Sequence, residues 1–264
     1  MPTSTTTAPI ASLLDRRPLV IGALHLPDFR TETREMARLE DHLLGNLRAF
    51  AEGGMPAVMI QDQTREPGAA GIETVAMMAA LVRLARREFP QIALGVIVQA
   101  HDADAPLAIA HASGASFVRL KVFVGSAMTA EGPRDALGPR ARNVRAGLAR
   151  PDIAILADVH DRTAVPLGDV DLAQACRWSQ GLGADALILT GADFAESCAR
   201  IETARKAGIA RPLLIGGGVD AGNVKSALAV ADGVIVSRSL MRAGSGSPSW
   251  DRDRIRSLMA AVAP

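Results

Sequence analysis

Two basic residues stand inside an otherwise apolar stretch, residues 117–122 (FVRLKV), of this 264-residue chain. Arg119 and Lys121 are two positions apart, so in a β-strand their side chains point to the same face. Because an unpaired charge is costly to bury against a helix, both should face a cavity. Such a pair would stabilise negative charge on a substrate. Lys121 could also act as a general acid or as a Schiff-base amine.

A carboxylate ends another apolar stretch, residues 153–158. Asp158 is predicted to meet Arg119 and to act as a general acid or base, with Asp62 or Asp102 as its counterpart. His160 lies two positions further, on the same face as Asp158. The alternative is that Arg119 and Asp158 form only a structural ion pair.

Further polar residues follow the apolar stretches. Besides Asp158 and His160, these candidate site residues are His25, Gln61, Asp62, Gln99, His101, Asp102 and Thr190. Asp102 could instead cap the next helix, and His25 could be a core histidine bonded to the backbone. Asp62, His101, Asp102 and Asp158 together could hold a divalent metal, but no HxH or HExxH spacing is present. We therefore predict a site that requires no cofactor.

A glycine-rich segment, residues 213–240, predicts an anion site. Gly216, Gly217 and Gly218 follow one apolar stretch and remove the β-carbons that would keep a ligand from the backbone. Ser237, Arg238 and Ser239 follow the next stretch and add two hydroxyls and a guanidinium. We expect Asp220 to cap a helix over residues 221–230, which would direct free N–H groups at a phosphate. The alternative is a plain strand-to-helix turn.

These residues need a frame that brings strand ends together. Eight apolar segments are each followed by a helical pattern, and the segments are continuous rather than alternating, as parallel strands covered on both faces should be. The predicted strands span residues 19–24, 57–60, 93–98, 116–122, 153–158, 186–190, 213–215 and 234–236. The fold class is therefore α/β, a single-domain (β/α)8 TIM barrel over residues 16–264, after a flexible tail at residues 1–15. A doubly wound sheet would need fewer strands or a longer chain.

The long loop at residues 123–138 has glycines near both ends and could close as a lid, or pack on a neighbouring subunit. The net charge of +1 and the 3% aromatic content argue against nucleic acid as a partner. The chain has no uninterrupted run of 18 apolar residues, so no membrane span is predicted. No secretory signal is recognised either, and we therefore expect a cytoplasmic protein. By analogy with other barrels, we expect a homo-oligomer.

Several motifs in this order resemble the BtpA/SgcQ family, within the ribulose-phosphate-binding barrel group. They are GALHLP (22–27), GGMPAVMIQD (53–62), the stretch 95–122, ILADVHDRTA (155–164), ADALILTG (184–191), PLLIGGGV (212–219) and ADGVIVSRSL (231–240). Departures from the family pattern fall at Gln61-Asp62, Arg65, Arg162-Thr163, Ser237-Arg238-Ser239 and Met241. The chain therefore resembles a divergent member.

The resemblance implies a TIM barrel with affinity for phosphate, and two functions follow. The first is an enzyme acting on a phosphorylated sugar or nucleoside-like metabolite, by isomerisation, lyase chemistry or glycosidic cleavage. The second is a non-catalytic assembly or stability factor, as in the family branch linked to photosystem I. A small anionic substrate is the expected partner of the first.

Overall fold

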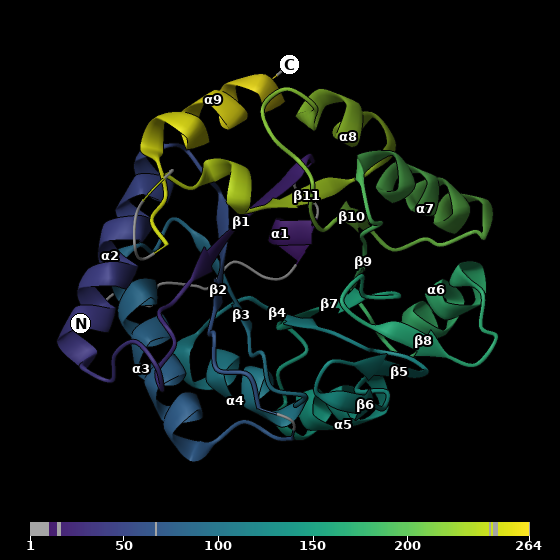
Figure 1. Ribbon diagram of the computed structural model, residues 1–264, viewed down its shortest axis with the longest axis horizontal. Helices are drawn as coiled ribbons and strands as arrows, with labels where there is room; N and C mark the ends of the chain where they lie inside the picture. Colours follow the sequence, from purple (N-terminus) through teal and green to yellow (C-terminus); the bar gives the residue numbers. More distant parts are fainter. Residues whose placement is uncertain (1–10, 15–16, 67, 243, 245–247, 264) are drawn as a thin grey trace.

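Eight parallel strands close into a barrel in this computed structural model, which describes residues 11–14, 17–66, 68–242, 244 and 248–263 (Figure 1). The order around the barrel is β1-β11-β10-β9-β7-β4-β3-β2. The strands are β1 (Leu19–His25), β2 (Ala57–Gln61), β3 (Ala93–Ile97), β4 (Phe117–Leu120), β7 (Ala154–Asp158), β9 (Ala186–Leu189), β10 (Leu213–Ile215) and β11 (Gly233–Val236). The predicted TIM barrel is confirmed.

Helices surround the barrel; seven of those named below connect one barrel strand to the next, and α9 follows the last strand (Figure 1). They are α2 (Met36–Glu52), α3 (Ile72–Glu88), α4 (Asp104–Ser113), α5 (Gly138–Gly147), α6 (Leu172–Gly181), α7 (Phe194–Lys206), α8 (Val224–Val230) and α9 (Arg252–Val262). Two short elements complete the chain, α1 (Ala11–Leu14) and the 3-10 turn η1 (Arg238–Leu240). Residues 1–10 of the predicted tail lie outside the described residues.

Two apolar cores hold this frame together. The larger lies between the strands and the helices, and includes Leu43, Leu81 and Leu187. The smaller fills the barrel with inward-facing side chains such as Met59 and Phe117, and Leu13 and Leu14 of α1 are buried in it. Because the interior is packed with side chains, open space for a ligand is left at the carboxyl ends of the strands.

The loop predicted for residues 123–138 is a β-hairpin. Strands β5 (Ser126–Thr129) and β6 (Gly132–Arg134) pair antiparallel, and β8 (Val165–Leu167) pairs with the other side of β5. The segment predicted as a loop therefore has regular structure. The hairpin is tied down because the His101 Nε2 atom lies 2.8 Å from the Asp135 carbonyl oxygen.

Two predicted boundaries shift. Helix α8 begins at Val224 rather than at residue 221, and Asp220 accepts hydrogen bonds from the N–H groups of Gly222 and Asn223 in the preceding turn. Asp220 therefore shapes the loop instead of capping the helix. Strand β4 ends at Leu120, so Lys121 stands just beyond it. No helix in the described part of the chain is long and apolar enough to cross a membrane.

Candidate active site

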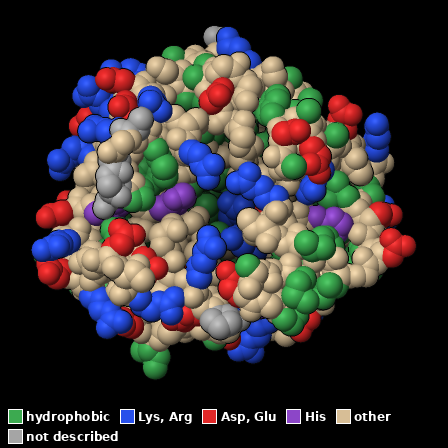
Figure 2. Space-filling model, in the orientation of Figure 1, with side chains coloured by type: hydrophobic (Ala, Val, Ile, Leu, Met, Phe, Trp, Pro, Cys, Tyr) green, Lys and Arg blue, Asp and Glu red, His purple; other side chains and the backbone are tan. Residues whose placement is uncertain are grey.

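A cavity of about 850 Å³ lies where the carboxyl ends of the strands meet. We call it the mouth cavity. Figure 2 shows Lys and Arg side chains gathered around the central hollow of this face. In the described part of the chain, five basic side chains line it, Arg65, Arg119, Lys121, Arg162 and Arg238, against two acidic ones, Asp161 and Asp220. This excess of cations favours an anionic ligand.

Most of the sequence-predicted residues meet in this cavity. Its lining includes His25, Gln61, Arg119, Lys121, Thr190, Gly216, Gly217, Gly218, Ser237, Arg238 and Ser239. His101 and Asp102 line a smaller hollow beside it, and His160 and Asp158 line a third one behind β7. Asp62 is fully buried and lines none of these three hollows.

Arg119 and Asp158 form a bidentate ion pair. The Nε and Nη2 atoms of Arg119 donate to the Asp158 Oδ2 and Oδ1 atoms at 2.7 and 2.8 Å. The side chains are 13% and 2% exposed, so the pair is nearly removed from water. Burial raises the pKa of Asp158, and the Arg119 guanidinium opposes that rise. Because both oxygens are held by Arg119, Asp158 orients this cation toward the mouth cavity.

Lys121 faces a carboxylate that the sequence did not single out. Its Nζ atom lies 4.0 Å from Asp161 Oδ2 and donates to Gln99 Oε1 at 3.1 Å. Burial lowers the pKa of Lys121, whereas the charge of Asp161 raises it. Asp161 also accepts from the Thr163 hydroxyl at 2.7 Å. A lysine and a carboxylate in contact at a cavity wall can exchange protons with a ligand.

The turn after β10 requires its glycines for two different reasons. A β-carbon on Gly216 would lie 2.3 Å from Thr190 Oγ1 and 2.5 Å from Ile188 Cγ2, which leaves no room for a side chain. Gly218 has a φ of +75°, in the left-handed region that favours glycine. The turn therefore presents bare backbone to the mouth cavity, as a phosphate cradle would.

The two serines after β11 were predicted to contact the anion through their hydroxyl groups, but these hydroxyls donate to backbone carbonyls instead. Ser237 Oγ donates to the Ala23 carbonyl at 2.9 Å, and Ser239 Oγ donates to the Val219 carbonyl at 2.8 Å. Both hydroxyl protons are thus used to hold neighbouring loops together. Among the side chains of this turn, Arg238 is left as the donor for an anion.

His25 lies at the edge of the cavity, with its Nε2 atom 3.4 Å from Ser237 Oγ. Burial and the nearby charges of Arg119 and Arg238 lower its pKa to about 4. The imidazole is therefore neutral at pH 7 and does not add to the positive charge of the site.

Asp62 is turned away from the cavity and toward the backbone. Its Oδ1 accepts from the Gln99 N–H at 2.7 Å, and its Oδ2 accepts from the Thr64 N–H at 3.1 Å. Burial raises its pKa to about 6, despite these hydrogen bonds. These contacts describe a side chain that fixes the ends of β2 and β3, rather than an acid or base for a ligand.

The raised pKa of Asp62 predicts a pH effect on stability. The folded protein holds the proton more tightly than the unfolded chain, so the stabilisation is present below about pH 4 and is lost as the pH rises through 6. The shift corresponds to about 3 kcal/mol. Between pH 4 and 7.5, the free energy of unfolding measured in urea should fall by this amount more in wild type than in Asp62→Asn. The prediction is contradicted if the free energies of the two proteins change with pH in parallel.

The other predicted acids and bases have structural partners. Asp102 Oδ1 accepts from the N–H groups of Asp104 and Ala105 at the start of α4, so the capping alternative is the one observed. His160 does not line the mouth cavity, and its backbone carbonyl accepts from Arg200. In the described part of the chain, no three His, Cys, Asp or Glu residues are grouped to hold a metal ion.

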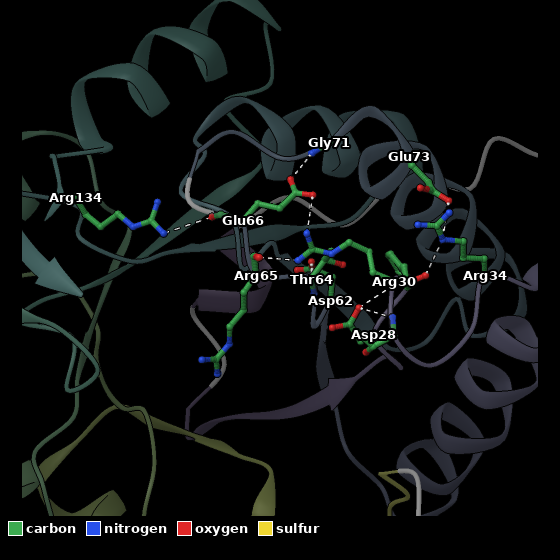
Figure 3. Close-up of polar contacts among 12 residues, drawn as sticks. Asp28, Arg30, Arg34, Asp62, Thr64, Arg65, Glu66, Gly71, Glu73 and Arg134 are labelled. Carbon is green, nitrogen blue, oxygen red and sulfur yellow. Dashed lines mark hydrogen bonds and ion pairs between the residues drawn. The ribbon is translucent and has the colours of Figure 1, made fainter. Parts of the chain in front are cut away.

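Arg65 reaches the cavity from a braced loop between β2 and α3 (Figure 3). The Arg65 carbonyl accepts from Arg30 at 2.6 Å, and Glu66 accepts from the Gly71 N–H at 2.8 Å. Figure 3 shows the Arg65 side chain extending away from these contacts. Arg65 and Arg162 were absent from the predicted site, although both stand where the sequence departs from the family pattern.

Comparisons with known proteins bear on this arrangement. The model of the BtpA family matches residues 16–264. The chain is 29% identical over 252 residues to the photosystem I biogenesis protein BtpA of Synechocystis sp., covering 92% of this chain and 88% of that protein. It is 30% identical over 249 residues to an uncharacterized protein of Archaeoglobus fulgidus, covering 92% and 98%.

Solved structures share the fold at low identity. Tryptophan synthase from M. tuberculosis superposes with a TM-score of 0.62 at 13% identity, covering 97% of this chain and 96% of that one. Phosphoribosyl anthranilate isomerase from Thermococcus kodakaraensis gives a TM-score of 0.54 at 16% identity, covering 92% and 97%. Likenesses at this level of identity establish the barrel and not the reaction.

Proposed function

The chain belongs to the BtpA family, and from this premise we propose that it is an enzyme whose mouth cavity binds a phosphorylated sugar or nucleoside-like metabolite. The observation that carries the proposal is the convergence of five basic side chains on one cavity with two acidic ones. A cytosolic phosphate ester is an anion that such a site would concentrate. Enzymes with this fold place their chemistry at the same end of the barrel.

The phosphate is assigned to the side of the cavity formed after β10 and β11. Gly216–Gly218 offer backbone there, and Arg162 lies 3.8 Å from the position of a β-carbon on Gly217. Arg238 lines the cavity from the neighbouring turn. In TIM barrels the loops after the last two strands often bind phosphate. The name of the T. kodakaraensis isomerase also indicates a phosphorylated substrate, on the same fold.

The reaction is assigned to the part of the cavity wall formed by the ends of β3 and β4 and the turn after β7. Arg119 reaches from this wall to the glycine turn, where its Nη2 atom lies 3.7 Å from the position of a β-carbon on Gly216. Lys121 and Asp161 exchange a proton with the ligand, while Arg119, held by Asp158, stabilises the negative charge that develops. Isomerisation, lyase chemistry and glycosidic cleavage all require such a transfer.

Arg238→Ala should weaken the binding of inorganic phosphate by roughly ten- to a hundredfold, because one charge-assisted hydrogen bond is lost. Isothermal titration at low ionic strength measures this. Arg48→Ala, an exposed arginine on α2, is the matched control and should bind phosphate as wild type does. If wild type and Arg238→Ala bind phosphate with equal affinity, the assignment of the phosphate site to this turn is wrong.

A second candidate function is a non-catalytic assembly factor, favoured by the name of the Synechocystis relative. In that case the mouth cavity is expendable. A partner interaction that survives Arg238→Ala together with Lys121→Met, without turnover of any sugar phosphate by the wild type, would support this function over the first.

We also propose that the chain forms a homo-oligomer through the three-stranded sheet. Met128, Val165 and Leu167 are large hydrophobic residues exposed on β5 and β8, and Trp178 on α6 is exposed beside them. Exposed apolar patches commonly mark protein interfaces. Val165→Glu with Trp178→Glu should shift the mass measured by light scattering to that of a monomer. Wild-type protein that is already monomeric at micromolar concentration would contradict this.

A further inference from the structure

A second, smaller hollow of about 130 Å³ lies beside the mouth cavity, between the ends of β3 and β4 and the β5–β6 hairpin. We call it the hairpin compartment. It shares six lining residues with the mouth cavity, Arg65, Gln99, Arg119, Lys121, Asp161 and Thr163. A ligand in the mouth cavity can therefore extend into the compartment along this common wall.

The charges of the two spaces differ. The hairpin compartment is balanced, with four basic residues, Arg65, Arg119, Lys121 and Arg134, and four acidic ones, Glu66, Asp102, Glu131 and Asp161. The mouth cavity has five basic residues and two acidic ones. Glu66, Asp102 and Glu131 line the compartment and not the mouth cavity, so a phosphate is more favourably placed at the glycine turn. The balanced charge of the compartment suits an uncharged polar group.

The wall of the compartment offers both donors and acceptors. Lys121 donates to Gln99, and Asp161 accepts from Thr163, so ammonium, amide, carboxylate and hydroxyl groups stand together. A sugar hydroxyl both donates and accepts, and such a mixed wall matches it. At about 30 Å³ for each water molecule, the space holds several waters and therefore part of a sugar.

The compartment also has a polar rim. Arg65 Nη1 lies 3.8 Å from Glu131 Oε1, which joins the β2–α3 loop to the turn of the hairpin. On the next strand of the hairpin, Arg134 donates to the Glu66 carbonyl at 3.4 Å. These contacts hold the hairpin beside the ends of β3 and β4, so the hairpin forms one wall of the compartment.

The large aromatic side chains that usually stack on a nucleobase are missing from the described lining of both spaces. None of the described lining residues is Phe, Tyr or Trp, and the aromatic rings are those of His25 in the mouth cavity and His101 in the compartment. Proteins that hold unpaired bases usually stack them on aromatic side chains. The lining therefore favours a sugar over a nucleoside.

We propose that the hairpin compartment is a binding site for the hydroxyl groups of a sugar monophosphate whose phosphate lies at Gly216–Gly218. This inference rests on the proposed function and deepens it. Strands β10 and β11 lie across the barrel from β3 and β4. Arg119 connects the two sides, because it lines both spaces and its Nη2 atom lies 3.7 Å from the position of a β-carbon on Gly216. A single ligand beside Arg119 can therefore contact both the glycine turn and the wall of the compartment.

Calorimetric titration of the full chain with inorganic phosphate, ribose 5-phosphate, ribose and AMP tests this. Ribose 5-phosphate should bind roughly ten- to a hundredfold more tightly than inorganic phosphate, the gain from hydrogen bonds to charged groups. AMP should bind more weakly than ribose 5-phosphate. Gln99→Leu should bind inorganic phosphate as wild type does, but should lose most of the additional affinity for ribose 5-phosphate. Gln91→Leu, exposed at the other end of β3, is the matched control.

The outcomes separate the two levels of the proposal. Equal affinities for phosphate and ribose 5-phosphate overturn the sugar site and leave the phosphate site standing. The sugar site is also overturned if AMP binds more tightly than ribose 5-phosphate. It is overturned as well if Gln99→Leu still binds ribose 5-phosphate more tightly than inorganic phosphate by the same factor as wild type. If neither phosphate nor ribose 5-phosphate binds, the proposed function itself fails.

Discussion

Arg119→Met is expected to lower the free energy of unfolding by about 3–5 kcal/mol. The substitution leaves the Asp158 carboxylate, only 2% exposed, without the two hydrogen bonds at 2.7 and 2.8 Å that compensate its burial. Solvation by water cannot replace them, because Asp158, the last residue of β7, is buried. Urea unfolding at pH 7 measures the loss.

An exposed pair with the same geometry is the control. Arg140 donates to both oxygens of Asp104 at 2.9 Å, but the two side chains are 67% and 49% exposed. Arg140→Ala should therefore change the unfolding curve little, since exposed pairs contribute little to stability. The double variant Arg119→Met with Asp158→Leu should recover much of the lost stability. If Arg119→Met lowers the free energy of unfolding no more than Arg140→Ala does, burial does not determine how much the ion pair contributes to stability.

The barrel was predictable because its signal is long-range and repeated. Each parallel strand is buried on both faces and reads as a continuous apolar run, and eight such runs alternate with helical periodicity. The β5–β6–β8 sheet was not predictable by this route. Its strands have three or four residues, and β8 pairs with β5 across about 40 positions, for instance Met128 with Val165. Segments this short carry no periodicity that distinguishes them from loop.

The positions of the candidate site residues were largely predictable, but their contacts were not. The strand ends predicted the contact between Arg119 and Asp158, and most of the predicted residues line one cavity. For Asp102 the sequence offered helix capping only as an alternative, and it gave no sign that Asp62 turns back to accept from backbone N–H groups. It also could not show that Asp161 comes to the cavity. Asp161 follows His160, whose φ of 51° turns the chain, and the residue order does not reveal where such a turn directs the next side chain.

Asp161→Asn is expected to lower kcat by about 10²–10⁴-fold, the usual contribution of a general acid or base. The substrate for this measurement is the one identified by screening phosphorylated sugars with the purified protein. The amide can still accept from Thr163, so the loop keeps its geometry, while the carboxylate that faces Lys121 at 4.0 Å is lost. Binding of inorganic phosphate at the glycine turn should stay unchanged.

The pH–rate profile distinguishes catalysis from a structural effect. Burial lowers the pKa of Lys121, and the charge of Asp161 raises it, so removing that charge must move the basic limb of the profile to still lower pH. Asp220→Asn is the matched control. Asp220 lines the same cavity but accepts from N–H groups of its own turn, so kcat should change by no more than a few-fold and the limb should not move. Equal losses in the two variants, or an unmoved limb in Asp161→Asn, would remove the Lys121–Asp161 pair from the mechanism.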